Sequence, residues 1–457
     1  MTEERIPHKS KRSLRSRFYA TRLLALSFFA MIVVGAFLLT LPWASSTGKS
    51  VGLFNALFTA TSAVCVTGLT VIETGTAYSL FGQTVILLLI QAGGLGFVTL
   101  MTLISVALGR RVTLRDRMLI QEAMNENNIG GMVRLILWVI KLTFACELAG
   151  AALLSVRFIQ DFGPVRGVYY AIFHSVSAFC NAGFDILGEG RSVMRYAQDP
   201  LVSLTLCALV ISGGLGFGVL NDLLHARRFS KMRLHTKLVL VATGTLLLAG
   251  MLGTLAAEWN NPGTLGGMSV GGKLLAALFQ SVTLRTAGFA TLAQDALRPA
   301  SKFLGVALMF VGAAPASTGG GMKVTTVSIL VLLTASIIRG KKDTSVFGRM
   351  LSTDLVKRAM AIFMTGLAVL ILCTMLLSAL HPEIAFIDVL FECVSALCTV
   401  GLSTAGTTSY CGAAQLVLVL MMYMGRIGPL TLALAVAKRQ QSQSISLSYP
   451  EENVTIG

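Results

Sequence analysis

Four short segments of related sequence recur along the chain, and each ends in a glycine followed by an apolar residue. They read SAVCVTGL (62–69), SAFCNAGF (177–184), VTLRTAGF (282–289) and SALCTVGL (395–402). Their glycines lie between 105 and 115 residues apart. Self-similarity at a nearly constant period is the signature of an architecture built from one repeated unit. We therefore expect four copies of a unit that carries one glycine-containing break.

Each glycine segment has the same neighbours, and these define the unit. A long apolar run comes first, then a short segment of helical character, then the glycine segment and a second apolar run. The first runs are 21–43, 133–158, 236–257 and 358–380, the short segments are 52–65, 167–180, 270–284 and 385–398, and the second runs are 79–108, 200–224, 302–338 and 412–437. About 20 apolar residues span a bilayer as a helix, so the runs can cross and the short segments cannot. The short segments are predicted to be re-entrant pore helices.

The predicted fold is an all-α membrane protein with four tandem helix–pore-helix–helix units arranged pseudo-fourfold around one central pore. It would have eight transmembrane helices and four re-entrant pore helices. The chain of 457 residues is 54% hydrophobic and only 13% charged, whereas soluble domains are roughly a quarter charged. Few segments alternate in polarity, which favours helices over a β-barrel. Helices recur in any helical membrane protein, but that alternative does not explain four Ser- and Thr-rich segments that end in glycine.

The boundaries of the units follow from this period. We expect a basic cytoplasmic N-terminus at 1–19, pore units at 20–110, 111–228, 229–345 and 346–440, and a C-terminal tail at 441–457. The first apolar run is longer than the apolar core of a secretory signal, which predicts a retained first membrane helix. The tail is apolar enough to dock at a subunit interface.

The formal net charge of +16 is concentrated in short loops between the apolar runs. These basic loops are 9–17, 109–117, 226–237, 339–349 and 437–440, whereas the opposite loops carry acids such as Glu73 and Asp185. Lys and Arg accumulate in the cytoplasmic loops of membrane proteins. Two crossings per unit also return the chain to one side, so both arguments place the termini in the cytoplasm. The basic surface therefore indicates topology and contact with membrane lipids rather than nucleic-acid binding.

The glycine segments are suited to a partly dehydrated monovalent cation. Irregular backbone at membrane depth persists only where it is buried in protein or lines a water-filled cavity. A ring of backbone carbonyls can replace the hydration shell of a cation. No carboxylates occupy matching positions, which disfavours a filter for divalent ions, and the recurring Cys65, Cys180 and Cys398 are predicted to be small buried residues. The candidate filter residues are Val66, Thr67, Gly68, Asn181, Ala182, Gly183, Thr286, Ala287, Gly288, Thr399, Val400 and Gly401.

Several further motifs make the chain similar to a known family. GGLGF occurs at 93–97 and 213–217, TAGF at 286–289, STGGGMKV at 317–324 and GRIGPLTLA at 425–433. Together with the fourfold unit they resemble the Trk/Ktr/HKT superfamily of potassium transporters, from about residue 20 to the C-terminus. The extra N-terminal helix pair typical of Trk-type subunits has no counterpart before the first apolar run. The chain therefore looks most like the Ktr-type potassium-translocating membrane subunit.

The resemblance implies potassium uptake across the bacterial cytoplasmic membrane, with potassium held at the filter carbonyls. It also implies a homodimer with one pore per protomer and a cytoplasmic ring of nucleotide-binding regulatory (RCK-type) subunits. The chain has no GxGxxG motif after a strand, so any nucleotide site would belong to that partner, and no cofactor is expected in this chain. A glycine in the first filter accompanies potassium preference in the family, so Gly68 favours potassium. Sodium is a candidate coupling or activating ion.

The second apolar run of the third unit is interrupted by GAAPASTGGGMK (312–323). A proline and three successive glycines break a helix. One interpretation is a kink or a packing site. The resemblance implies instead a flexible intramembrane gate below the filter, built from Pro315, Ser317, Thr318, Gly319, Gly320, Gly321, Lys323 and Arg426.

Isolated charges in the apolar runs are functional candidates, because a charge in a membrane span needs a partner or a cavity. The resemblance implies that Arg426 is a positive barrier near the gate; the alternative is that it binds helix-end carbonyls. For Arg285 we expect an ion pair with Glu392 behind the filter. Glu147 could be a proton site, or it could pair with Lys141 or with another helix.

Three alternative functions are weighed against potassium uptake. A sodium-permeable or ion-coupled symporter could have the same fold. An organic-solute carrier is expected to show charged and aromatic residues that repeat between halves, and the sequence offers no such pairs. A membrane enzyme needs a nucleophile with a matching base, which the Ser- and Thr-rich segments lack. We therefore expect no enzymatic activity.

Overall fold

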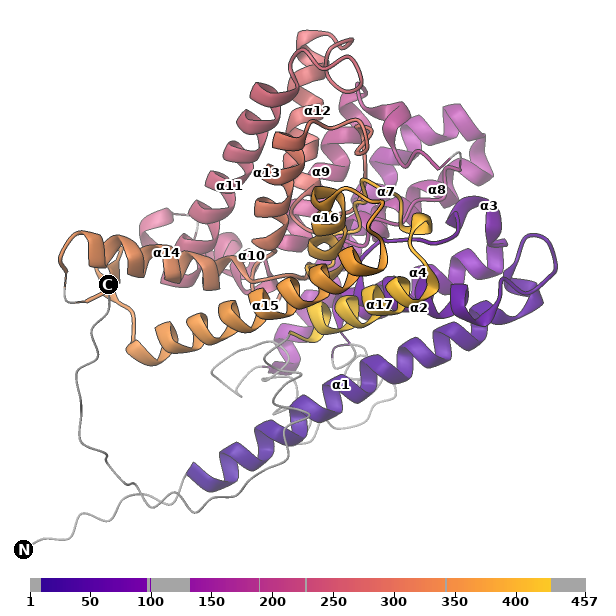
Figure 1. Cartoon of the computed structure of the whole chain (residues 1–457). Helices are drawn as coiled ribbons and strands as arrows, with labels where there is room; N and C mark the ends of the chain where they lie inside the picture. The colour runs from indigo at the N-terminus through magenta and orange to yellow at the C-terminus, as the bar shows by residue number, and fades with distance from the viewer. Residues whose placement is uncertain are drawn as a thin grey trace, which may run out of the picture.

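The computed structural model describes residues 10–96, 99, 132–188, 190–226, 228–341 and 343–428, and Figure 1 shows how its elements are arranged. This part of the chain is helical, apart from a short antiparallel hairpin of β1 (Ser345–Val346) and β2 (Arg349–Met350). The end of the second run of unit 1, the boundary between units 1 and 2 and the C-terminal tail were predicted for residues outside the described ones.

Four long helices are formed by the first apolar runs of the four units. They are α1 (Ser10–Thr40), α7 (Met132–Phe162), α11 (Leu234–Glu258) and α15 (Thr353–Leu380). By length and composition, each contains a stretch that could cross a membrane, and a bent helix pair could add a fifth span within the described residues. Large apolar side chains such as Phe37, Leu148 and Leu372 are exposed on these helices. Exposed apolar faces on long apolar helices are typical of membrane spans, where lipid surrounds the helix.

Four shorter helices lie where pore helices were predicted, with bounds that agree to within three residues. They are α2 (Leu53–Cys65), α8 (Pro164–Phe179), α12 (Val270–Thr283) and α16 (Phe386–Leu397). Each packs against the long helix that precedes it. Pro164 at the first position of α8 already has a helical φ angle. The residues around Ser269 have the GxSxG spacing of hydrolase nucleophiles, but the Ser269 hydroxyl caps α12 by accepting a hydrogen bond from the Gly272 amide at 3.2 Å.

Small residues bring the long and short helices into close contact. In unit 2 the Ser175 hydroxyl donates to the backbone carbonyl of Glu147 at 2.6 Å, and in unit 3 the Ser281 hydroxyl donates to the carbonyl of Leu247 at 2.6 Å. Gly150 lies opposite Ser175, and a methyl group there would come within 2.5 Å of the Ser175 hydroxyl oxygen. The same helix–helix hydrogen bond therefore recurs in two units.

The second apolar runs form shorter and broken helices. Unit 1 has α4 (Leu80–Leu95), unit 2 has α9 (Pro200–Gly214) and α10 (Phe217–Ala226), unit 3 has α13 (Pro299–Phe310) and α14 (Val324–Ile338), and unit 4 has α17 (Gly412–Ile427). The break between α13 and α14 was predicted. The 99° bend between α9 and α10 was not, because the run 200–224 was expected to be one helix.

Hydrogen bonds from unit 3 explain the bend in unit 2. The amides of Ala314 and Thr318 donate to the carbonyls of Gly214 and Gly213 at 3.0 and 3.2 Å. The amide of Phe217, the first residue of α10, donates to the Ala316 carbonyl at 2.9 Å. The groups that a helix end leaves unpaired are thus satisfied by the loop of another unit. Gly216, with a φ angle of +88°, makes the turn.

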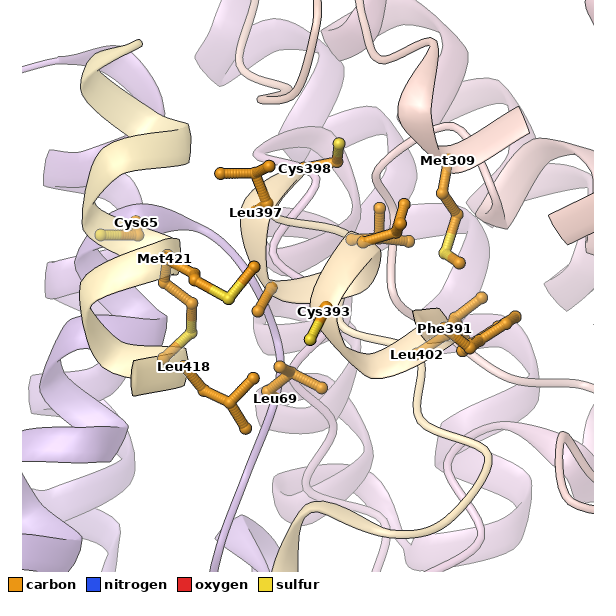
Figure 2. Close-up of a cluster of buried hydrophobic side chains, with 14 of the residues drawn as sticks. Cys65, Leu69, Met309, Phe391, Cys393, Leu397, Cys398, Leu402, Leu418 and Met421 are labelled. Atoms are coloured by element: carbon orange, nitrogen blue, oxygen red, sulfur yellow. The ribbon is translucent and has the colours of Figure 1, made fainter. Parts of the chain in front are cut away.

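The largest apolar core lies behind the fourth glycine segment. Figure 2 shows Cys65, Leu69, Leu397, Leu402 and Met421 converging from α2, α16, α17 and the segments between them. A second core joins α7, α8, α9 and α12. The remaining short elements are α3 (Thr74–Ala77), η1 (Pro42–Ala44), η2 (Met194–Tyr196), η3 (Phe229–Lys231) and η4 (Thr407–Ser409).

One buried carboxylate fastens α11 to the start of α13. Glu258 is fully buried and accepts hydrogen bonds from Asn261, Thr264, Ser301 and the Arg298 amide. Replacing Glu258 with alanine would leave these donors unpaired, so we expect the free energy of unfolding to fall by about 3 kcal/mol. Thermal unfolding of the purified protein measures this loss. Asp295→Ala, at an exposed acid between α12 and α13, is the control, and equal effects of the two substitutions would contradict the prediction.

Candidate cation site and gate

The four glycine segments adopt one backbone conformation. The first candidate residue of each has a positive φ angle: 58° at Val66, 57° at Asn181, 69° at Thr286 and 50° at Thr399. The glycines have φ angles of 95°, 69°, 85° and 93° in the same order. A positive φ is unfavourable for a β-branched residue. Its recurrence at Val66, Thr286 and Thr399 shows that the surrounding structure imposes this conformation.

The amide groups of the segments are directed back to the short helices. In each segment, the amide of the residue between the two positive-φ residues donates to a carbonyl near the end of the segment's own short helix, at 2.7–3.0 Å. The donors are Thr67, Ala182, Ala287 and Val400. In units 1 and 4 the glycine amides donate to the Ser62 and Ser395 hydroxyls at 3.0 and 3.1 Å. In the described part of the chain, no hydrogen bond ends on the carbonyl oxygens of Thr67, Ala182, Ala287 and Val400, so these oxygens could serve as cation ligands.

The four segments contact one another in a closed ring. A methyl group added to Gly68 would lie 2.5 Å from the Ala182 carbonyl oxygen, and one on Gly183 would lie 2.7 Å from the Ala287 oxygen. A methyl group on Gly288 would lie 2.6 Å from the Val400 oxygen, and one on Gly401 would overlap the Thr67 oxygen. The order of contacts is therefore unit 1, 2, 3, 4 and back to unit 1, with glycine facing a carbonyl each time.

Three threonine hydroxyls of the glycine segments are buried without a protein partner in the described part of the chain. Among the described residues, nothing forms a hydrogen bond with the buried hydroxyls of Thr67, Thr286 and Thr399. Buried polar atoms in proteins are almost always hydrogen-bonded or bound to a ligand. The apolar residue after each glycine is buried as well and anchors the segment on its outer side; these residues are Leu69, Phe184, Phe289 and Leu402.

The segment between α13 and α14 lies directly against the first residues of the ring. A methyl group on Gly319 would come within 2.5 Å of the Thr286 hydroxyl, and one on Gly320 would overlap the Thr399 hydroxyl. The Thr318 hydroxyl donates to the Phe179 carbonyl at 2.9 Å and lies 3.3 Å from the Asn181 side-chain amide. This segment, 312–323, therefore contacts the first residues of the glycine segments in units 2, 3 and 4. Pro315 and Ser317 are partly buried at its turn.

Two cationic side chains hold the 312–323 segment. Arg426 of α17 donates to the carbonyls of Thr318, Gly93 and Gly94 at 2.5, 2.5 and 3.2 Å. The Lys323 ammonium donates to the Gly319 carbonyl at 2.8 Å. Arg426 thus binds helix-end carbonyls of α4 and the segment at the same time. The contact with helix-end carbonyls is one of the two interpretations offered from the sequence, and the positive barrier stays a prediction.

The predicted partners of two other charges were wrong. Arg285 donates to the Gly312 carbonyl at 3.1 Å, whereas the Glu392 carboxylate accepts from the hydroxyls of Ser403 and Thr407 at 2.5 and 2.7 Å. Glu392 faces the loop that follows its own glycine segment, and Arg285 points toward the end of α13, so they do not pair. Glu147 contacts Gln91 of α4 and Cys180, in agreement with the alternative that its partner lies on another helix, whereas the side chain of Lys141 is exposed. Cys65, Cys180 and Cys398 are free and buried, as predicted.

Sequence reasoning missed three glycines that bring the second helices close to the ring. A methyl group on Gly93, Gly213 or Gly425 would overlap the last carbonyls of a short helix, those of Val64, Phe179 and Leu397. The paired glycines of GGLGF could have indicated this close approach, but they were interpreted only as motifs of the family. Their structural role is close approach to the ends of the short helices.

Long apolar helices that enclose a buried ring of backbone oxygens define a helical membrane transporter. The chain belongs to the TrkH family, described as cation transport protein, which matches residues 8–448. This confirms the resemblance to the Trk/Ktr/HKT superfamily.

Individual relatives span nearly the whole chain. The Ktr system potassium uptake protein B of Bacillus subtilis is 41% identical over 443 residues, which cover 96% of this chain and 97% of that protein. The potassium/sodium uptake protein NtpJ of Enterococcus hirae is 36% identical, with 98% and 99% covered. The crystal structure of the potassium transporter TrkH from Vibrio parahaemolyticus aligns with a TM-score of 0.73 at 20% identity, covering 95% of this chain and 87% of that one. At that identity the likeness concerns the fold alone.

Proposed function

We propose that this protein is the potassium-translocating subunit of a Ktr/Trk-type uptake system in the cytoplasmic membrane, and that it has no catalytic activity. Four helix–pore-helix–helix units would surround one pore, with both termini in the cytoplasm. The observation that carries the proposal is the closed ring of contacts between Gly68, Gly183, Gly288 and Gly401 and the neighbouring carbonyls.

The ring residues fit a monovalent cation as the transported ion. The ligands available are the backbone carbonyls that the glycines face and the hydroxyls of Thr286 and Thr399, which have no partner among the described residues. Neutral oxygens at the ends of four short helices favour a cation through their partial negative charge. We assign Val66, Thr67 and Gly68 and the corresponding triplets 181–183, 286–288 and 399–401 as the selectivity filter.

Two ions compete for this assignment. One of the two relatives named above is called a potassium uptake protein, and the other is called a potassium/sodium uptake protein. Gly68 supports potassium, because glycine at this position accompanies potassium preference in the family that the chain resembles. A sodium-permeable or ion-coupled mode is the second candidate, and the name of the NtpJ relative is the observation in its favour.

We assign the gate to residues 315–321 together with Lys323 and Arg426. Its support is the contact of Gly319 and Gly320 with Thr286 and Thr399, the first residues of two segments of the proposed filter. A homodimer and a cytoplasmic ring of nucleotide-binding regulatory subunits complete the proposal. The regulatory ring would bias the gate between two conformations that differ by a few kcal/mol.

Ion flux from purified protein in liposomes tests the function. We expect flux of potassium to exceed that of sodium and lithium, and addition of the regulatory subunit to change the rate with bound nucleotide. Equal rates for the three ions would contradict the potassium assignment. Sodium flux above potassium flux would establish the second candidate instead.

Shortening the segment 315–321 by two residues tests the gate. We expect potassium flux to rise several-fold and its control by the regulatory subunit to weaken, because the shorter segment cannot reach both Thr286 and Thr399. The measurement is rubidium uptake in a potassium-transport-deficient bacterial strain. Removal of Phe347 and Gly348 from the turn between β1 and β2 is a control deletion of equal length. If flux fell and regulation by the regulatory subunit were unchanged, the segment would have only a structural role.

A further inference from the structure

Glu147 is a buried acid that the proposed transport mechanism does not use. It lies at the middle of α7, and only 4% of its surface is exposed. Its carboxyl group contacts the Gln91 side-chain amide at 3.4 Å and the Cys180 thiol at 3.9 Å. The Ser175 hydroxyl donates to the backbone carbonyl of Glu147 and not to its carboxyl group.

The partners of Glu147 are those of a neutral acid. Ionised carboxylates are buried in proteins only with a cation or several strong donors, because the loss of hydration is otherwise very costly. Within the described part of the chain, no Lys, Arg or His side chain forms an ion pair with Glu147. Glu258 shows the contrast, since four donors surround its carboxylate. A protonated carboxyl group can instead share weak hydrogen bonds with Gln91 and Cys180.

The two contacts of Glu147 lead to the proposed filter and to the proposed gate. Cys180 directly precedes Asn181, and its sulfur packs so closely on Gly94 that a methyl group there would lie 2.7 Å away. Gln91 lies on α4, within one turn of the Gly94 carbonyl that accepts from Arg426. The carboxyl group of Glu147 therefore contacts α4, whose carbonyls bind Arg426, and the start of the second glycine segment, which the 312–323 segment contacts.

Within the described residues, the other titratable or charged groups near Glu147 lie on its own helix α7, on α8 and at the end of α17. Cys146 neighbours it on α7. On α8, His174 is surrounded by the rings of Phe158, Phe173 and Phe289 and bonds the Tyr170 carbonyl. From α9 the apolar Leu209 packs near Gly150. Arg426 is linked to this network through the Gly93 and Gly94 carbonyls of α4 and through its electrostatic interaction with Cys180.

We propose that Glu147 is a proton-binding site whose occupancy sets the potassium flux. This proposal rests on the proposed transport function. With the proton bound, the group is neutral and compatible with the close packing of α4, α7 and α8, which presents the Gly93 and Gly94 carbonyls to Arg426. Loss of the proton creates a carboxylate that needs water or a cation. Hydrating it separates these helices and loosens the hold of Arg426 on the gate, so flux is low at low pH and rises with pH.

Flux measured across a pH series in liposomes tests the proposal. We expect the wild-type rate to rise at least threefold between its acidic and alkaline limits. Glu147→Gln, which imitates the protonated acid, should stay at the acidic rate throughout, and Glu147→Asp should keep a pH-dependent rise. Lys141→Gln is the control on the same helix and should follow the wild type. A Glu147→Gln profile that overlays the wild-type profile would overturn the proposal.

A second measurement detects the proton without relying on transport. Infrared difference spectra between acidic and alkaline protein should show a carboxylic-acid carbonyl band that disappears in Glu147→Gln and moves in Glu147→Asp. If purified protein shows no potassium flux at any pH yet keeps this band, the transport function fails and proton binding stands. An unchanged band in the aspartate variant would overturn proton binding, even where the glutamine variant does not fold.

Discussion

Replacing Gly68 with serine is expected to remove the preference for potassium over sodium and to cut potassium flux at least tenfold. Gly68 has a φ angle of 95°, which L side chains rarely adopt. Its added Cβ would lie 2.5 Å from the Ala182 carbonyl oxygen, so that oxygen must move away from the ring. Strain of about 1–3 kcal/mol per residue is typical of such backbone, and about 1.4 kcal/mol already corresponds to a tenfold change.

The measurement is competition between rubidium and sodium for uptake by cells or liposomes. Gly48→Ser is a matched control, because Gly48 also has a positive φ angle, 71°, but nothing lies within 4 Å of the position of its added Cβ. The control should lose some stability and keep its selectivity. If Gly68→Ser retained wild-type selectivity, the ring of glycine segments would not be the filter.

Replacing Arg426 with glutamine is expected to raise potassium flux about tenfold or more and to make it insensitive to the regulatory subunit. The guanidinium bridges the Thr318 carbonyl and the Gly93 and Gly94 carbonyls, which the shorter amide cannot span. Its charge also opposes a passing cation: at about 8 Å and an effective dielectric constant of about 20, this amounts to about 2 kcal/mol. Both effects hold the pathway closed, so their loss acts in one direction.

Arg426→Lys separates the two contributions. Lysine keeps the charge but is a point donor rather than a planar fork, so it retains the electrostatic barrier and loses the bridge. We expect an intermediate flux from single-channel or tracer measurements, with partial loss of control. A fall in flux for Arg426→Gln in protein that remains folded would show that the bridge supports the open conformation instead.

Repetition in the sequence predicted the long helices, the short helices and the glycine breaks with good accuracy. The repeat predicts these features because each unit must bury its own short helix and end it with a residue of positive φ. It did not predict the positive φ angles of Val66, Thr286 and Thr399, since local preference opposes them and only the surrounding contacts impose them.

Partners between units were the weaker part of the sequence interpretation. The bend after α9 depends on hydrogen bonds that the amides of Ala314 and Thr318 donate and that the Ala316 carbonyl accepts, and these residues lie about 100 positions away in the chain. The pair proposed for Arg285 and Glu392 failed because each group has another contact: one Arg285 nitrogen donates to the Gly312 carbonyl, and the Glu392 carboxylate accepts from two nearby hydroxyls. The sequence identifies isolated charged residues in the apolar runs, but the groups that they contact depend on how the units pack together.

The hydroxyl groups beneath the ring divide it into two unlike halves. In units 1 and 4 the Ser62 and Ser395 hydroxyls accept from the glycine amides, whereas in units 2 and 3 the Ser177 and Thr283 hydroxyls donate to the Phe184 and Phe289 carbonyls. Units 1 and 4 are neighbours around the ring, and so are units 2 and 3. In a channel of four identical chains, one substitution alters every quarter of the filter at once. Here a single gene encodes all four segments, so each segment can mutate by itself. Evolution can therefore change the ion affinity of the proposed filter one segment at a time, without rebuilding the whole ring.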